Sequence, residues 1–290
     1  MAYEIFGIKI DDLSEADLSA LFLSWLVGQE PVFKLIVTLN PEFLLQARKD
    51  RAFKDVLNSA DAALPDGVGM RFALAALTPN LLTHRHTGTE TLLLLANLCA
   101  EKGKRLGLVG GLPGSAEKAA AFLKETIPNL RVFGFDPGAV DADDPSSPPL
   151  PRGGLQKMPP PAKEGLRGGI IAHLQQEQPD VLAVGLGQKK QELFLRQVAP
   201  MVPSIKIGIG IGGVLDVLGK TLLPAPAWMR RSGLEWLWRF TQEPKRFHRI
   251  WNAVVVFPAL VIWHTLKART FLGACRRTIP EIFRQLFLFS

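Results

Sequence analysis

Cysteine is scarce in this sequence: only Cys99 and Cys275 occur among its 290 residues. They lie far apart, and neither has a His or Cys neighbour at the spacing of a metal site. Disulfides are rare in reducing compartments, so two isolated thiols favour an intracellular protein with both cysteines reduced. The first residues also lack a basic start followed by an apolar run, and we therefore expect no signal peptide.

Two common nucleotide-binding signatures are missing as well. The chain has no Walker loop, and its first predicted strand, residues 34–39, leads into Asn-Pro instead of the GxGxxG turn of a dinucleotide-binding fold. A sugar-nucleotide oxidoreductase, the alternative enzyme on the same kind of fold, requires that turn and an acidic residue about twenty positions later. The sequence therefore favours a different chemistry.

Apolar residues make up 47% of the chain, which predicts a folded protein with one sizeable core. Through residues 1–227, short β-branched runs alternate with helical patterns, including one helix expected from Pro41 to about Asn58. This alternation predicts an α/β fold, a Rossmann-like parallel sheet with helices on both faces. In such sheets ligands bind at the carboxyl ends of the strands. The predicted strands cover residues 34–39, 62–64, 105–109, 130–135, 180–185 and 205–211.

Two segments differ in composition from the rest. Residues 141–169 contain seven prolines and few bulky apolar side chains, which is typical of a mobile surface loop. Residues 228–290 hold eleven Lys or Arg against three Glu, a net charge of +8, whereas residues 1–227 are close to neutral. A basic tail indicates an anionic partner, either nucleic acid or a phospholipid surface. We therefore expect an α/β domain over 1–227 and a separate appendage over 228–290.

Within this tail, residues 250–266 carry no formal charge. As a helix they span roughly 26 Å, short of the ~30 Å hydrocarbon core of a bilayer, and Pro258 is expected to kink them. Trp251 and Trp263 mark the two ends, where interfacial aromatic residues gather. Seventeen uncharged residues fit lipid better than nucleic acid, so we predict an interfacial or re-entrant membrane anchor. The basic residues that flank it are Lys245, Arg246, Arg249, Lys267 and Arg269.

Asp66 is the first candidate for chemistry. It follows the short predicted strand 62–64 and precedes a glycine-rich helix start. A carboxylate at a strand end is placed to take a proton from an acceptor hydroxyl, as a general base does. Aspartate is equally favoured as a helix N-cap, and the residues alone leave both interpretations open.

Four further motifs carry weaker signals. The turn 110–115 joins a strand to a helix and suits a diphosphate, but a plain tight turn fits the same residues. Arg85 has the fork geometry for phosphate, although a solvated loop arginine is common, and its two flanking histidines are poor evidence for a metal. Gln191 opens a helix, where polar side chains are often simply solvated. The glycines of 208–213 indicate either an approaching ligand or close packing.

The order of these motifs resembles the TagA/WecG/CpsF family of bacterial glycosyltransferases. The likeness covers about residues 3–249 and leaves the proline-rich segment and the last forty or so residues outside it. The matching motifs are Thr38-Leu39-Asn40-Pro41, Leu64–Gly69, Arg85 to Gly88, Val109–Gly114, Gly185–Glu192, Gly210–Asp216, Ala225-Pro226 and Gly233–Arg249.

The resemblance implies an inverting transfer of a sugar from a UDP-sugar donor to a polyprenyl-diphosphate-linked saccharide in wall or surface polysaccharide synthesis. It implies Asp66 as the general base with Thr38 beside it, and no metal or other cofactor, in keeping with the lack of a DxD-type cluster. The appendage would attach the enzyme to anionic lipids at the cytoplasmic face of the inner membrane, with no nucleic-acid partner. The residues expected to bind the donor are Asn40, Arg85, Gly110, Gly111, Gln191, Gly213 and Asp216.

The sequence departs from the family pattern at two positions. Lys189 stands where family members usually have proline, and Pro224 stands where they usually have arginine. The second change leaves that position without the phosphate contact of an arginine. A non-catalytic membrane-surface scaffold is the remaining alternative, but it leaves the polar residues at the strand ends unexplained.

Overall fold

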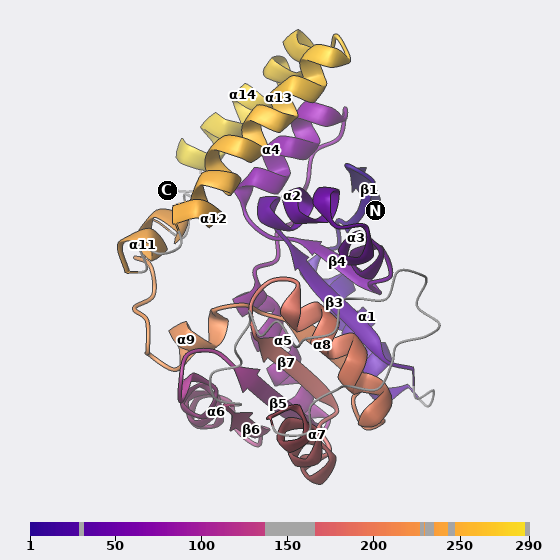
Figure 1. Ribbon diagram of the computed structural model, residues 1–290, viewed down its shortest axis with the longest axis vertical. Coiled ribbons are helices and arrows are strands. Elements are labelled where there is room, and N and C mark those ends of the chain that lie inside the picture. Colours follow the sequence, from indigo (N-terminus) through magenta and orange to yellow (C-terminus); the bar gives the residue numbers. More distant parts are fainter. Residues whose placement is uncertain (29–31, 137–165, 227–228, 230–234, 243–246, 288–290) are drawn as a thin grey trace. The chain divides into compact units, whose positions relative to one another are not determined.

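The computed structural model describes residues 1–28, 32–136, 166–226, 229, 235–242 and 247–287 (Figure 1). Most of the segment 141–169, expected to be a surface loop, lies outside these residues, and so do Lys245 and Arg246. The last part of that segment, residues 166–169, begins a helix, α7.

Six strands form the main sheet, in the order β4-β3-β8-β7-β5-β6. The pairs β3–β4, β5–β6, β5–β7 and β7–β8 all run parallel. All of these strands except the edge strand β6 are buried along nearly their whole length, which requires cover on both faces. This parallel sheet with helices around it confirms the predicted α/β fold. The strands are β3 Lys34–Leu39, β4 Ala62–Pro65, β5 Arg105–Gly110, β6 Arg131–Phe135, β7 Val181–Gly185 and β8 Ile207–Gly210.

Two helices replace the single helix expected between Pro41 and Asn58. The first, α2 (Pro41–Lys49), ends at Asp50, whose extended backbone interrupts the helical path. The Asp50 side chain then accepts a hydrogen bond from the Phe53 N–H group and caps α3 (Arg51–Asn58). The other elements before the C-terminal region are β1 Ala2–Ile5 and β2 Ile8–Asp11, which form an antiparallel hairpin, α1 Glu15–Val27, α4 Val68–Leu77, α5 Gly88–Glu101, α6 Ser115–Thr126, α7 Leu166–Glu177, α8 Lys190–Val198, η1 Ala199–Met201 and α9 Val214–Leu218.

The chain divides into two compact units. Unit 1 comprises Met1–Leu21, Ile36–Thr91 and Leu222–Ser290, and it holds the β1–β2 hairpin, β4, α2 to α4 and the C-terminal helices. Unit 2 comprises Phe22–Leu35 and Leu92–Thr221, and it holds β5 to β8 and α6 to α9. The C-terminal region therefore belongs to the same unit as the residues around Asp66.

Unit 2 contains a topological switch point. From β5 the chain passes through α6 to β6 on one side, and from β7 it passes through α8 to β8 on the other side. Since β5 and β7 are neighbours, the loops that leave their carboxyl ends diverge. Open α/β sheets bind ligands at such points. The two loops here are 111–114 and 186–189.

A continuous helix, Phe247–Lys267, dominates the C-terminal region of unit 1. It consists of α12 (Phe247–Trp251), the π-helical turn η3 (Asn252–Val256) and α13 (Phe257–Lys267). The π-turn ends two residues before Pro258. By length and composition alone, this helix of 21 residues, which contains an 18-residue stretch with a mean hydropathy of 1.4, could cross a membrane. The remaining elements are α11 Glu235–Gln242 and α14 Phe271–Phe287.

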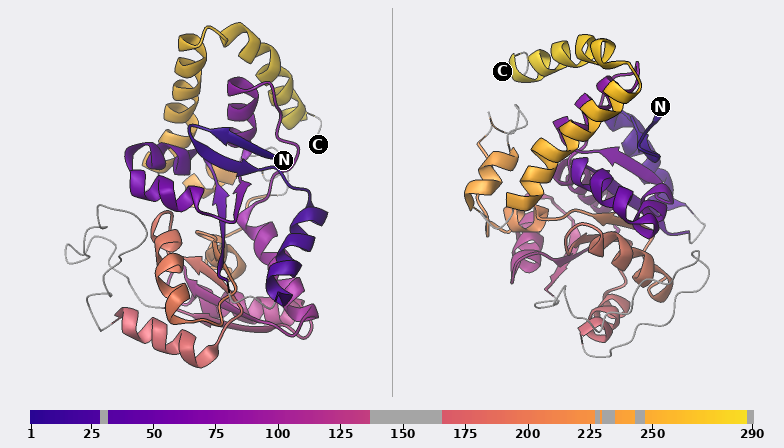
Figure 2. Two further views of the ribbon diagram at one scale, coloured as in Figure 1. Left: turned by 90° about the vertical axis from the view of Figure 1, so that its right-hand side faces the viewer. Right: turned by 45° about the horizontal axis from the view of Figure 1, so that its top comes forward.

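α4 packs against both α13 and α14 (Figure 2). On α13 the buried side chains are Phe257, Val261 and Thr265, whose spacing of four places them on one face of the helix. At the other contact, the Arg277 guanidinium of α14 donates to the Ala75 carbonyl (2.8 Å), which belongs to the last turn of α4. The C-terminal helices are thus integrated into unit 1.

Candidate functional site

Thr38 and Asp66 lie at the carboxyl ends of two neighbouring strands of unit 1. In the parallel pairing of β3 and β4, Thr38 is opposite Leu64. The Asp66 N–H group then donates to the Leu39 carbonyl at 2.7 Å, which extends the pairing by one step. Thr38 is buried, whereas Asp66 is only partly buried. The structure therefore brings the expected base and its expected neighbour to the same sheet edge.

Asp66 does not occupy the N-cap position of the following helix. That position in α4 belongs to Gly67, whose φ of 83° lies in the region that favours glycine, and no side chain caps the helix there. One residue earlier, the Pro65 carbonyl accepts a hydrogen bond from His86 N–H at 3.0 Å. Backbone contacts on both sides thus fix the position of Asp66, and the N-cap interpretation is wrong.

Asn40 has a structural role at the start of α2. Its side-chain oxygen accepts hydrogen bonds from the N–H groups of Glu42 (3.0 Å) and Phe43 (3.3 Å). This is the usual geometry of an asparagine N-cap. Among the described residues, no acceptor bonds the Asn40 amide nitrogen, so that nitrogen remains a donor for a ligand.

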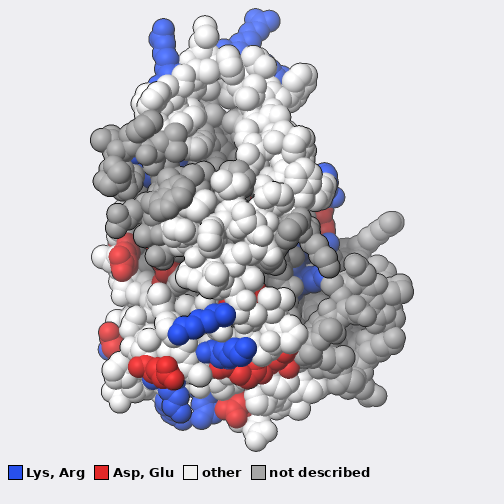
Figure 3. Space-filling view, turned by 90° about the vertical axis from the view of Figure 1, so that its left-hand side faces the viewer, with Lys and Arg blue, Asp and Glu red and all other residues white. Residues whose placement is uncertain are grey.

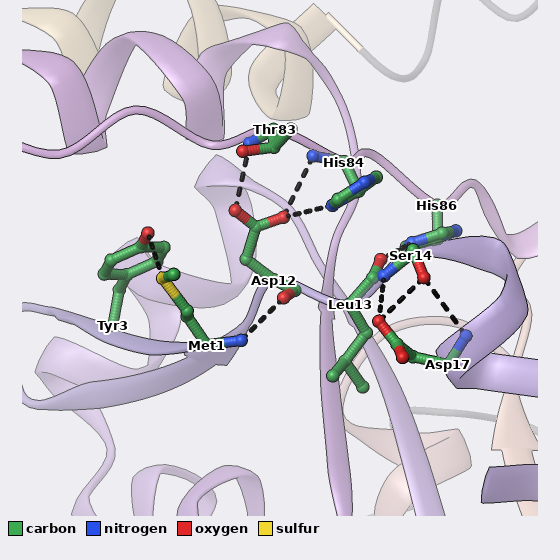
Figure 4. A network of polar contacts seen from close by, with 9 residues as sticks. All are labelled: Met1, Tyr3, Asp12, Leu13, Ser14, Asp17, Thr83, His84 and His86. Atoms are coloured by element: carbon green, nitrogen blue, oxygen red, sulfur yellow. Dashed lines mark hydrogen bonds and ion pairs between the residues drawn. The ribbon is translucent and has the colours of Figure 1, made fainter. Parts of the chain in front are cut away.

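The loop that carries Arg85 is held by the segment after β2. Figure 4 shows the Asp12 carboxylate facing the N–H groups of Thr83 (3.0 Å) and His84 (2.9 Å) and the His84 ring. Partial burial raises the pKa of Asp12, but these hydrogen bonds outweigh it, so the pKa lies below its usual 3.8. The ring of His86 contacts the Leu13 carbonyl at 2.7 Å. The rings of His84 and His86 therefore both help to hold this loop in place. Within the described ranges, no cluster of three or more His, Cys, Asp or Glu could hold a metal.

Replacing Asp12 by Ala is expected to destabilise unit 1 by about 1–3 kcal/mol, because two backbone donors lose their acceptor. The Asp12 contribution is complete above the unfolded pKa near 3.8 and is lost as the pH falls through the lower folded pKa. Urea unfolding at pH 7 and at pH 3 measures this difference, which should shrink at the lower pH. Glu15→Ala removes the same charge from an exposed site and is the control. Equal stability of both variants at pH 7 would contradict the role of Asp12.

In unit 2, Gly110 is the last residue of β5 and Gly111 begins the tight turn that follows. Both have positive φ, 95° and 87°, and a side chain on Gly111 would collide with Asp216 and Ser115. The N–H groups of the turn are engaged within unit 2: Gly111 donates to the Gly185 carbonyl (3.0 Å) and Leu112 to the Asp216 carboxylate (2.7 Å).

The Gly114 N–H group of the same turn donates to the Asp136 carboxylate (2.9 Å). The N–H groups of Leu112 and Gly114 are therefore both bonded to carboxylates of the protein itself, those of Asp216 and Asp136. The plain-turn interpretation accounts for this geometry, and buried Asp216 has a visible role in holding the turn. Donor binding by Gly110, Gly111 and Asp216 stays a prediction. Gly213 lies at the N-cap of α9, directly after β8 and the 211–212 connection.

Gln191 and its neighbour Glu192 are buried at the start of α8, with 2% and 0% of their surface exposed. Simple solvation of a helix start is therefore the wrong interpretation for these side chains. The Gln191 side-chain oxygen accepts from Gly212 N–H at 3.0 Å, and its nitrogen donates to Glu192 at 2.7 Å. Burial raises the pKa of the Glu192 carboxyl to about 7.

Sequence reasoning did not single out Glu192 as a site residue. The sequence feature that points to Glu192 is a distant glycine, Gly210. A side chain at position 210 would collide with both Gln191 and Glu192. The glycines of 208–213 are thus explained in part by close packing.

Of the residues expected at the membrane, Trp251 and Trp263 are exposed, whereas Arg249 is paired within the protein. Figure 3 shows that the upper part of one face carries few charged side chains among the described residues, with Lys and Arg atoms at its upper edge. Arg249 forms an ion pair with Glu42 of α2 at 2.8 Å. The exposed large apolar residues described on the C-terminal helices are Leu237, Phe247, Trp251, Val254, Val255, Val256, Ile262, Trp263, Leu266, Leu272, Ile279 and Phe283.

A comparison with known families matches residues 3–271 to the model of the glycosyl transferase WecG/TagA/CpsF family. The chain belongs to this family. The match extends past the resemblance seen in the sequence and takes in most of the C-terminal region.

Two curated relatives have the same printed name, N-acetylglucosaminyldiphosphoundecaprenol N-acetyl-beta-D-mannosaminyltransferase. The protein of Bacillus subtilis (strain 168) is 29% identical over 216 residues, which cover 74% of each chain. That of Bacillus spizizenii (strain ATCC 23059 / NRRL B-14472 / W23) is 26% identical over 215 residues, again 74% of each chain. Both names describe a glycosyltransferase whose acceptor is a sugar linked through a diphosphate to a lipid.

Proposed function

We propose that this chain is an inverting glycosyltransferase that moves a sugar of the hexosyl or N-acetylhexosaminyl type from a UDP-sugar to a polyprenyl-diphosphate-linked saccharide. The observation that carries the proposal is the position of Asp66 in a chain of this family. Asp66 stands at a strand end beside Thr38, held by backbone contacts and not used as a helix cap. The names of the two relatives support the lipid-linked acceptor.

Asp66 acts as the general base in this mechanism. The acceptor hydroxyl oxygen attacks the anomeric carbon of the donor sugar while its proton passes to the Asp66 carboxylate. The bond from that carbon to the diphosphate oxygen breaks, and its electron pair leaves with UDP. A single displacement of this kind inverts the configuration at the anomeric carbon.

The negative charge that develops on the leaving diphosphate needs hydrogen-bond donors or cations. We assign this role to the Arg85 guanidinium and the Asn40 amide nitrogen of unit 1. Arg85 is carried by a loop that Asp12 holds in place. Because these groups supply the stabilisation, the reaction is proposed to need no metal ion.

We further propose that the C-terminal helices attach the enzyme to the cytoplasmic face of the membrane as a monotopic element. Apolar burial comes from the exposed face of helix 247–267, and attraction to anionic lipid comes from exposed cations such as Lys267 and Arg269. Both ends of this helix contact α2: Arg249 pairs with Glu42, and His264 lies 3.2 Å from Arg48. A helix held along α2 at both ends favours lying in the interface over spanning the bilayer.

The direct test is UDP release by the purified full-length protein in EDTA, with a panel of UDP-sugars and a short-chain lipid diphosphate acceptor carrying N-acetylglucosamine. We expect UDP release that depends on both substrates and an inverted product linkage. Titration of UDP into the same EDTA-treated protein should show binding. A scaffold protein would release no UDP with any donor, and activity that returns only with Mg²⁺ or Mn²⁺ would contradict the metal-free mechanism.

A further inference from the structure

Gln191 and Glu192 form a hydrogen-bonded pair that ties the first turn of α8 to the end of β8. The Gly212 N–H group, a donor only, faces the Gln191 side-chain oxygen, and the Glu192 carboxylate, an acceptor only, faces the Gln191 nitrogen. The second oxygen of Glu192 accepts from the Lys189 N–H group at 2.7 Å. With a donor on one side and an acceptor on the other, the Gln191 amide has only one favourable orientation.

After these bonds, one N–H donor of the Gln191 amide remains for a further hydrogen bond. The Gln191 nitrogen carries two hydrogens, and Glu192 accepts one of them. Among the described residues, no second acceptor contacts this nitrogen, although the side chain is 2% exposed. Buried amide hydrogens are rarely left without a partner, so a ligand oxygen is the natural acceptor. The loop before α8 leaves β7 at the switch point of unit 2, where ligands bind in open α/β sheets.

We propose that Glu192 is a positioning residue of the transfer reaction: its carboxylate holds the Gln191 amide so that the second amide hydrogen bonds an oxygen of the donor diphosphate. This inference rests on the proposed function, because it takes the donor to be a nucleoside diphosphate sugar. Glu192 acts only through Gln191 and does not touch the donor itself.

Lys189 helps to hold the Glu192 carboxylate in this position. Its backbone N–H group donates to the Glu192 oxygen that does not face Gln191. The φ of Lys189, 71°, is unusual for a residue other than glycine. A proline at this position would meet neither requirement, because its ring fixes φ at about −65° and it has no N–H group.

Protonation of Glu192 is expected to disturb the pair. A neutral carboxyl is a weaker acceptor than a carboxylate and carries a hydrogen of its own, so the hydrogen bond from the Gln191 nitrogen is expected to weaken. The groups that face Glu192 from β8 and from the loop before α8 are Gly210, the Gln191 amide and the Lys189 backbone, none of which titrates near neutral pH. Donor affinity should therefore fall as the pH drops through about 7, the pKa to which burial raises Glu192.

The test is a double-mutant cycle of Glu192→Gln and Gln191→Ala in the full chain, with UDP affinity measured by calorimetry at pH 8. We expect each single change to weaken UDP binding about tenfold to a hundredfold, and Glu192→Gln to have no further effect in the Gln191→Ala background. Glu125→Gln, the same change on an exposed helix surface, should leave affinity unchanged. Additive effects, or normal affinity in Glu192→Gln, overturn the positioning role, whereas a wild-type protein that binds no UDP overturns the proposed function itself.

A second measurement does not depend on the variants folding. Binding of UDP-N-acetylmannosamine, whose phosphates do not titrate near neutral pH, is measured on the wild-type protein between pH 6 and 8.5. We expect affinity to fall on the acid side of about pH 7 and the fall to be absent in Glu192→Gln where that variant is folded. A wild-type affinity that is constant over this range contradicts the proposal.

Discussion

Asp66→Asn is expected to lower kcat by a factor of about 10²–10⁴, the usual contribution of a general base. Asparagine has nearly the same shape as aspartate but cannot accept the proton of the attacking hydroxyl. The backbone contacts that place this residue, from Asp66 N–H to Leu39 and from His86 N–H to Pro65, do not involve its side chain. The variant should therefore fold normally and bind UDP with wild-type affinity.

Three measurements separate this prediction from a general loss of structure. Thermal unfolding and UDP titration should match the wild-type protein, while turnover with saturating donor and acceptor should fall. Asp55→Asn makes the same change on the exposed surface of α3 and should retain full activity. Near-wild-type turnover of Asp66→Asn would remove Asp66 from the mechanism, and the base would have to be sought elsewhere.

The fold was predictable because its signals are local. Alternating apolar strands and helical patterns are read from neighbouring residues, and the predicted strand 34–39 coincides with β3. The break between α2 and α3 was missed although its cause is also local: Asp50 caps the second helix. Aspartate is a common cap, but in a run that continues as helix on both sides the pattern alone predicts one helix.

The candidate site was only partly predictable, because its contacts join residues far apart in the chain. The bond from Leu112 to Asp216 connects positions separated by 104 residues, and no spacing rule indicates it. Glu192 reads as a solvated helix-start residue until the fold places β8 against α8, and only then is it buried. The role of Asp66 as a base came from the family resemblance, and the structure removed its competing role as a helix cap.

The C-terminal helix illustrates the same limit. Its apolar composition is visible in the sequence, but the sequence does not tell which of its faces is buried. Phe257, Val261 and Thr265 pack inside unit 1, whereas Ile262, Trp263 and Leu266 remain 47%, 63% and 52% exposed. Deleting the whole tail would remove this buried face and expose the surface of α4 against which α13 and α14 pack. A test of membrane attachment must therefore change only the outer residues.

Replacing Ile262, Trp263 and Leu266 together by Glu is expected to release the protein from membranes while leaving unit 1 folded. Each apolar side chain lost from the lipid interface costs about 1–2 kcal/mol, and each added negative charge near an anionic surface costs about 1 kcal/mol more. The partition coefficient should fall at least about a thousandfold. The wild-type protein should stay bound at about 1 M salt, which screens the charges but not the apolar contribution, and should need detergent for release.

Flotation with phosphatidylglycerol-containing vesicles measures this change, and the double variant Leu81→Glu, Leu223→Glu is the control, because both leucines are exposed outside the C-terminal helices. The triple variant should turn over a short-chain soluble acceptor at the wild-type rate and lose activity only on acceptor held in vesicles. Flotation equal to that of the wild type would show that this face does not enter the bilayer. A loss on both acceptors would instead place these residues in the reaction, since a purely lipid-binding face cannot affect a substrate that reaches the enzyme through water.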